Sequence, residues 1–198
     1  MSSRPSPLQN RVTAFGEIVA ENARGLMMGN RGGAIHQGWS IKRKQASRHW
    51  IICVTDFRGR ARKVMQSGYT ELFFLDEATA MAAGHRPCFE CRNKDAKAFR
   101  AAFGATFADD IDRVLAEERK AQPSVTEAAL HPGTMIASGE TAYLFTADGY
   151  HPWSFGGYGA AQAAPPDMRL LTPVSTVAAL RAGYRPLIHP SAGHSAVV

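Results

Sequence analysis

Short apolar runs separated by turn residues predict several β-strands along the chain. The clearest runs from Trp50 to Phe57 and is rich in β-branched and aromatic residues. The Arg58-Gly59 pair predicts a turn after it, with a returning arm from Arg60 to Met65 that would complete a β-hairpin. Further strands are expected at residues 12–20, with a bulge at Gly16, and at residues 72–75, 134–137, 141–146 and 168–171.

Other segments carry the three-to-four spacing of apolar residues that is typical of amphipathic helices. This spacing predicts one helix at residues 93–103 and a second from Asp109 to Lys120. An alanine-rich helix is also expected after residue 76. Asp76 can cap its first N–H groups, and Gly84 can end it in a left-handed conformation.

Together these elements predict an α+β fold in two parts. The first part, residues 10–121, would hold a basic β-hairpin region, a helix-turn-CxxC knuckle and a helical pair. The second, residues 133–198, would be a small β-rich part with a terminal helix. Residues 122–132 are expected to form a linker, and residues 1–9 a disordered lead.

The charge is spread unevenly over the 198 residues. Residues 1–63 hold 12 Lys and Arg against 3 Asp and Glu, a net charge of +9, whereas the whole chain carries +6. A basic front on a nearly neutral body is the electrostatic footprint of a protein that binds a polyanion such as nucleic acid. The plainer alternative is a solvated basic surface with no such partner.

Seven cations in this basic front are candidates for phosphate contacts. The first lies in the glycine-rich loop at residues 25–36, whose backbone N–H groups can face an anion, and three more lie in a cluster between Trp39 and Trp50. The others fall on the expected hairpin, where cations would instead guard a sheet edge if no phosphate is bound. The seven are Arg31, Lys42, Arg43, Lys44, Arg58, Arg60 and Arg62.

The sequence also repeats a short pattern at a distance of 99 residues. Ala80, Ala83, Gly84, Arg86 and Pro87 correspond to Ala179, Ala182, Gly183, Arg185 and Pro186. The repeat predicts a second helix that ends at a glycine and is followed by Arg-Pro. It is either a decayed duplication or independent use of a common strand–helix–glycine pattern.

Cys88 and Cys91 have the two-residue spacing of a metal knuckle, which lets both thiolates reach one zinc ion. Cys53 can join them if its strand lies beside residue 73. The fourth ligand is expected to be His85, His49 or His36. A reduced Cys-x-x-Cys that packs or does redox work is the alternative without a metal.

The stretch from Leu72 to Arg92 resembles the metal-binding domain of the Ada-type methylphosphotriester DNA repair protein and related small zinc modules. Gly84-His85-Arg86-Pro87-Cys88-Phe89-Glu90-Cys91-Arg92 matches that family's Gly-Tyr/Phe-Arg-Pro-Cys-x-x-Cys-Arg except at the aromatic position. The resemblance implies a zinc-binding fold piece that faces DNA. In that family a loop supplies two further cysteines, one of which accepts a methyl group, whereas here Cys53 is the only upstream cysteine.

From these residues we expect a zinc-stabilised protein that binds nucleic acid, DNA in particular, through phosphate contacts that are independent of sequence. The alternative is a metal- or His-dependent nuclease or another nucleic-acid-modifying enzyme, with His36 as its base beside Arg31. No apolar run reaches the roughly 18–20 residues that span a bilayer, and three cysteines do not make a disulfide framework. We therefore expect no membrane partner and a cytoplasmic location.

Overall fold

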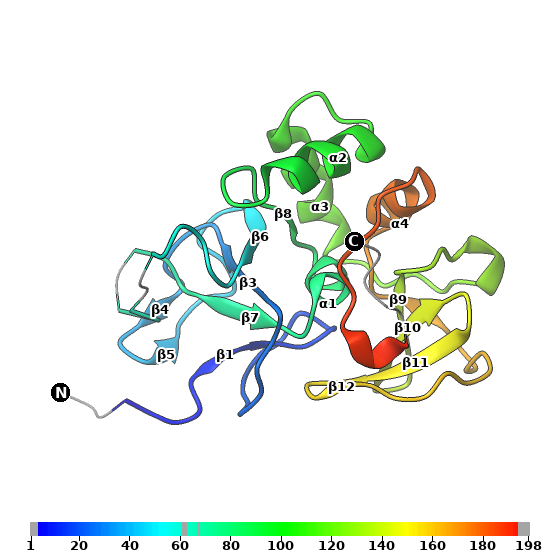
Figure 1. The fold of residues 1–198 in the computed structure, drawn as a ribbon, viewed down its shortest axis with the longest axis horizontal. Coiled ribbons are helices and arrows are strands. Elements are labelled where there is room, and N and C mark those ends of the chain that lie inside the picture. The colour runs from blue at the N-terminus through cyan, green and yellow to red at the C-terminus, as the bar shows by residue number, and fades with distance from the viewer. Residues whose placement is uncertain (1–3, 61–62, 67, 194–198) are drawn as a thin grey trace.

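The computed structural model describes residues 4–60, 63–66 and 68–193. Within these residues four α-helices accompany two main β-sheets, so the α+β class predicted from the sequence is confirmed (Figure 1). The helices are α1 (Glu77–Ala82), α2 (Asn93–Phe103), α3 (Ala108–Glu118) and α4 (Val174–Arg181). Two 3₁₀ turns, η1 (Glu127–Ala129) and η2 (Pro190–Ala192), complete the helical segments.

The first sheet has six strands in the order β2-β1-β7-β3-β6-β8. Its central strand β3 is buried at every position and pairs antiparallel with β6 and β7. The strands are β1 (Gln9–Val12), β2 (Ile18–Ala20), β3 (Met27–Arg31), β6 (Trp50–Val54), β7 (Leu72–Phe74) and β8 (Arg86–Pro87). A separate small hairpin joins β4 (His36–Gln37) to β5 (Ser40–Ile41).

The second sheet has five strands in the order β12-β11-β10-β9-β13, all in antiparallel pairs. They are β9 (Met135–Ser138), β10 (Thr141–Thr146), β11 (Gly149–Ser154), β12 (Gly157–Tyr158) and β13 (Arg169–Leu170). The aromatic stretch at residues 150–158 forms most of β11 and β12. Tyr150 and Tyr158 in these strands are buried in the hydrophobic core.

Helix α1 lies between the two sheets and packs against both (Figure 1). Ala80 and Met81 contact the core of the first sheet, whereas Ala78 and Ala82 contact the core of the second. All six of its residues are buried, which explains why small alanines predominate. Asp76 caps the helix as predicted, with its carboxylate accepting a hydrogen bond from the Thr79 N–H at 2.8 Å.

The sequence repeat corresponds to a structural repeat. Both sheets contain three antiparallel strands in the spatial order third, first, second: β7-β3-β6 and β13-β9-β10. A helix follows each set, and each helix ends in the same way. The N–H of His85 donates to the carbonyl of Ala80, and the N–H of Tyr184 donates to that of Ala179, both at 3.0 Å.

The N-terminal strand predictions need correction. Residues 9–20 form the hairpin of β1 and β2, so residues 12–20 are not one bulged strand, because Gly16 adopts a φ of 83° in the connecting turn. Strand β6 does not pair with residues 60–65. The Arg58-Gly59 turn is present, but both edges of β6 are already occupied by β3 and β8, and the described residues of that segment form no strand.

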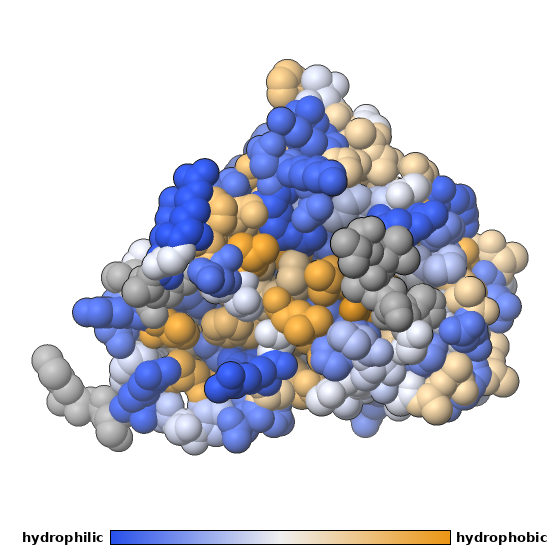
Figure 2. Space-filling model, viewed as in Figure 1, coloured by the Kyte–Doolittle hydropathy of each residue, from blue (hydrophilic) through white to orange (hydrophobic). Residues whose placement is uncertain are grey.

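The expected domain division stays a prediction. Ser124 and Val125 in the proposed linker bond to Arg169 and Met168 beside the second sheet. In the proposed lead, Leu8 is buried and Gln9 begins β1, while residues 1–3 lie outside the described residues. Figure 2 shows one face of the molecule, on which hydrophilic residues predominate toward the rim and hydrophobic ones gather near the centre.

Candidate functional site

The three cysteines of the chain come together on one face of the first sheet. Parallel pairing of β6 with β8 places Pro87 opposite Ile52, and the Cys88 N–H donates to the Ile52 carbonyl at 2.9 Å. This register brings the knuckle beside Cys53, so that the sulfurs of Cys53, Cys88 and Cys91 all lie within 4.8 Å of one another. Cys53 therefore lies beside the knuckle as predicted, but by another route: β3 separates its strand from residue 73 in β7, and the pairing of β6 with β8 brings the cysteines together.

The donor set of this cysteine cluster fits a thiophilic cation. Sulfur atoms bound at about 2.3 Å to a tetrahedral zinc ion lie about 3.8 Å from one another. The three sulfurs here, all within 4.8 Å of one another, are close enough to reach that spacing. The Glu90 N–H also points to the Cys88 sulfur at 3.4 Å, which favours a thiolate. Hydrogen bonds from the Cys53 and Cys91 thiols lower the pKa of Cys88, and the contact with Cys88 raises the pKa of Cys53.

His85 lies away from the three sulfurs, although the sequence placed it among the ligands. It is fully buried and packs between the rings of Trp50 and Phe74, at centroid distances of 4.9 and 4.8 Å. Its Nδ1 contacts the Ala80 carbonyl at 3.2 Å, and its Nε2 faces the Arg31 Nε at 3.5 Å. Burial, and then the charges of Arg31 and Arg119, hold the pKa of His85 well below its usual value. His85 therefore faces Arg31 rather than the sulfurs.

Four of the seven predicted phosphate contacts line one pocket of about 570 Å³. These are Arg31, Lys42, Arg43 and Lys44, and the structure adds Arg119, which follows the end of α3. From the sequence, Arg119 falls only within the helix expected from Asp109 to Lys120. Arg119 is 88 residues from Arg31 along the chain, so a local pattern gave no signal that the two meet.

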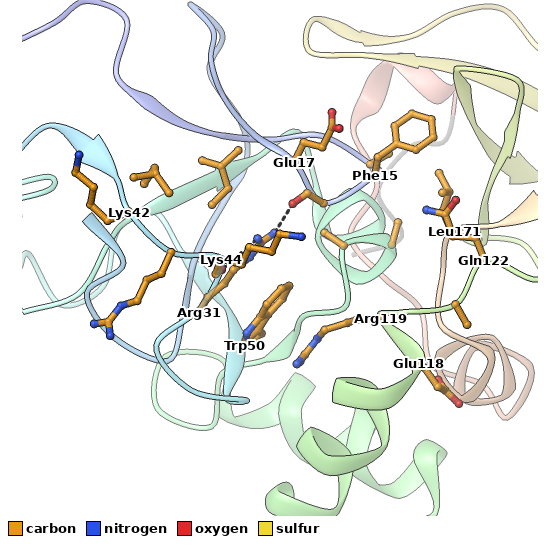
Figure 3. Close-up of a pocket in the computed structure, with 18 residues that line it drawn as sticks. Phe15, Glu17, Arg31, Lys42, Lys44, Trp50, Glu118, Arg119, Gln122 and Leu171 are labelled. Carbon is orange, nitrogen blue, oxygen red and sulfur yellow. Dashed lines mark hydrogen bonds between the residues drawn. The ribbon is translucent and has the colours of Figure 1, made fainter. Parts of the chain in front are cut away.

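Arg31 and Arg119 both pack on Trp50, with their guanidinium carbons 3.9 and 4.1 Å from its ring centre. Figure 3 shows the Trp50 ring between them. Because the ring is covered in this way and only 7% exposed, it is a platform for the two arginines rather than a surface for stacking a base.

Backbone carbonyls hold both guanidinium groups in place. Arg31 donates from Nη2 to the Gly16 carbonyl at 2.7 Å and from Nη1 toward that of Lys44 at 3.5 Å. Arg119 donates from Nε to the Gly84 carbonyl at 2.9 Å and from both Nη atoms to that of Arg48 at 3.2 Å. A Cβ at Gly84 would lie 2.5 Å from the Arg119 side chain, so glycine is needed there for this contact as well as for its φ of 82°.

Neither guanidinium forms an ion pair with a carboxylate in the part of the chain that the structure describes. Burial, followed by repulsion from Arg119, lowers the pKa of Arg31 to about 9. Burial also lowers the pKa of Arg119 to about 10, although the charge of Asp112 partly opposes this. Both shifts reflect the free-energy cost of a buried cation without an adjacent anion.

The remaining predicted residues lie elsewhere. Arg60 forms an ion pair with Glu90 of the knuckle at 2.8 Å, Arg58 packs on Phe57, and Arg62 lies outside the described residues. His36 does not line the pocket: its Nδ1 is 2.6 Å from the Thr70 hydroxyl, and His85 takes the place beside Arg31 that the nuclease hypothesis gave to His36.

A second group of potential ligands, His49, Asp109 and Asp112, is held by ion pairs. Asp112 is fully buried and accepts two hydrogen bonds from Arg86, and His49 Nδ1 lies 3.0 Å from it. Asp109 pairs with Arg48 at 2.7 Å. These contacts already account for the carboxylates, so we assign no metal to this group.

No protein family, curated protein or solved structure matches the chain. None of the helices within the described residues is long and apolar enough to cross a membrane.

Proposed function

We propose that the protein binds nucleic acid at the pocket between its two sheets, with zinc at Cys53, Cys88 and Cys91 as a structural support. One observation carries this proposal: the buried Arg31 and the partly buried Arg119, which form no carboxylate ion pair among the described residues, meet three further cations at one pocket. Clustered Lys and Arg side chains bind phosphate groups, whose negative charge they neutralise.

The free-energy cost of burying these charges supports an anionic ligand. A buried charge is expensive unless it is paired, and removing a partner from a buried ion pair costs about 3–5 kcal/mol. Among the described residues, backbone carbonyls and the face of Trp50 offset part of this cost for both arginines, and the more distant charge of Asp112 offsets part of it for Arg119. A phosphate would supply the missing charge and gain charge-assisted hydrogen bonds from the guanidinium groups.

The cysteine cluster supports the pocket through a shared strand. Cys53 and Trp50 both lie on β6, with Trp50 at the pocket and Cys53 among the sulfurs. A zinc ion on the three thiolates would tie β6 to the knuckle after β8 and so fix the strand that carries the Trp50 platform. With three protein sulfurs, the fourth ligand would be water or an added ligand.

The resemblance of residues 72–92 to the Ada-type zinc domain agrees with a DNA-facing role. Methyl transfer is not part of the proposal, because the proposal uses all three cysteines of the chain as metal ligands. A protein with free thiolate ligands suits the reducing cytoplasm.

Salt dependence of binding tests the proposal. Fluorescence anisotropy with labelled single- and double-stranded oligonucleotides should show log affinity falling linearly with log salt concentration, with little dependence on sequence. The double variant Lys42→Ala/Lys44→Ala should bind more weakly and show a shallower salt slope.

The matched control is Lys94→Ala/Lys97→Ala, which removes the same charge from exposed positions on α2 outside the pocket. An equal loss in both double variants would indicate a general charge effect and overturn the assignment to the pocket. Absence of binding at low salt, or binding that salt does not weaken, would overturn the proposed function itself.

A further inference from the structure

We propose that the pocket is built for a single nucleoside phosphate, with the phosphate held by Arg31, Arg119 and Lys44 and the base against an apolar wall. This inference rests on the proposed function and names the ligand unit that the pocket takes. Such a unit has two sources: a free mononucleotide, or the phosphorylated end of a strand. Both offer the same chemistry, a terminal phosphate joined to a planar base.

The cationic side of the pocket suits a terminal phosphate. Among the described residues, each of the two guanidinium groups directs three of its five N–H groups to backbone carbonyls or to His85 and leaves two for a ligand. Figure 3 shows Lys44 directly beside Arg31. A phosphate monoester carries a charge of about −1.5 to −2 at neutral pH, so it balances the two guanidinium groups better than the single charge of an internal phosphodiester does.

The opposite side of the pocket carries apolar side chains. Phe15 and Leu171 line it, and Figure 3 shows both across the pocket from Arg31 and Lys44, with Gln122 beside Leu171. Phe15 is partly buried against the core of the second sheet, which holds its ring in position. An aromatic ring next to a cationic site provides a surface on which a base can pack whatever its sequence identity.

The two carboxylates on the pocket do not cancel the cations. Glu118 is engaged by Ser175, whose hydroxyl donates to it at 2.6 Å. Figure 3 shows the Glu17 carboxylate pointing away from the Arg31 guanidinium. Located between the two sides of the pocket, Glu17 offers an acceptor for sugar hydroxyl groups, as acidic residues do in other nucleotide sites.

The volume of the pocket favours one nucleoside phosphate rather than a continuous nucleic-acid strand. The volume of about 570 Å³ falls within the range of about 300–1,000 Å³ that is typical of small-molecule sites. The pocket also combines a charged end with an apolar end, which matches a ligand that is itself charged at one end and planar at the other.

Calorimetric titration of the full chain with AMP, adenosine and inorganic phosphate tests this inference. AMP should bind at least about tenfold more tightly than either part, because only AMP fills both sides of the pocket. Lys44→Ala and Phe15→Ala should each weaken AMP binding about tenfold while keeping the wild-type circular dichroism spectrum, and Lys94→Ala should leave it unchanged. Equal affinities for AMP and inorganic phosphate would overturn the inference.

Two oligonucleotides of identical sequence, one with a 5′-phosphate and one with a 5′-hydroxyl, separate the sources. Tighter binding of the phosphorylated strand supports the strand end, whereas AMP binding without this preference supports the free nucleotide. Salt-dependent oligonucleotide binding with no AMP binding and no preference for the phosphorylated end would overturn this inference and leave the proposed function standing. AMP binding with no oligonucleotide binding at low salt would overturn the proposed function and leave the nucleotide pocket.

Discussion

Arg92 and Glu77 form a buried bidentate ion pair, with both N–O distances at 2.8 Å. Arg92 directly follows the knuckle, and Glu77 is the first residue of α1, so the pair joins the cysteine cluster to the helix between the sheets. Glu77 also accepts hydrogen bonds from the Tyr184 hydroxyl and the Leu187 N–H. One carboxylate therefore links the knuckle, the central helix and the C-terminal segment.

Breaking this pair should destabilise the protein strongly. Arg92→Ala would leave the Glu77 side chain, which is 0% exposed, without its cation, and we expect a loss of about 3–5 kcal/mol in the free energy of unfolding measured by urea denaturation. The exposed pair Lys120–Glu117 provides the control, since Lys120→Ala should cost less than about 1 kcal/mol. A loss below 1 kcal/mol for Arg92→Ala would show that the buried pair does not hold these segments together.

The burial of Asp76 should give stability a pH dependence of definite sign. Burial raises the pKa of Asp76 above its ordinary value of 3.8, even though Thr79, His189 and Tyr158 donate hydrogen bonds to its carboxylate. As pH rises above 3.8, Asp76 ionises first in the unfolded chain, so its contribution to stability falls until the pKa of the folded state is passed. Asp76→Asn removes this titration.

Urea denaturation of both proteins at several pH values upward from about 3.5 isolates the effect, because they share every other titrating group. The free energy of unfolding of the wild type, relative to that of Asp76→Asn, should decrease across this window. A constant or increasing difference would contradict a raised pKa.

The sequence predicted features that depend on near neighbours and missed those that depend on long-range packing. Asp76 and Gly84 marked both ends of α1 because capping is a local property. Cys53 was expected at the knuckle through a strand beside residue 73, whereas β8 makes that contact. The partners of β6 were missed because edge occupancy is set by β3 and β8, not by the Arg58-Gly59 turn.

The site shows the same division. Arg31, Lys42, Arg43 and Lys44 were recognisable as a local cluster of charge, whereas Arg119 reaches them only because α3 returns to the end of β6. His85 illustrates an error of the opposite kind. Its position three residues before Cys88 suggested a ligand, but the turn that ends α1 directs its ring into the core beside Trp50.

Gly29 should be irreplaceable at the centre of the first sheet. A Cβ added there would lie 2.2 Å from the Ile51 carbonyl oxygen, which belongs to the paired strand β6 and cannot move without breaking the sheet. We expect Gly29→Ala to lower the thermal midpoint by several degrees or to prevent folding, because overpacking of about 1–3 kcal/mol affects the strand that carries Trp50 and Cys53. Gly156→Ala, whose nearest contact would be 3.8 Å, should behave as the wild type. Equal midpoints for the two variants would show that β3 and β6 can separate at little cost.

Metal content tests the cysteine cluster directly. Elemental analysis of protein purified without added metal should find about one zinc per chain in the wild type and a loss in Cys53→Ser and in Cys88→Ser, because each substitution removes one of three sulfurs that lie together. His49→Ala and His36→Ala should retain the metal, since His49 lies beside Asp112 and His36 beside Thr70. Removing zinc from the wild type with a chelator should lower its thermal midpoint, while the cysteine variants, already without metal, should not respond. Metal-free wild-type protein would contradict the zinc site as a whole. A Cys53→Ser variant that keeps its zinc would show that Cys53 is not a ligand. In either case zinc would not connect β6, and with it the Trp50 platform, to the knuckle.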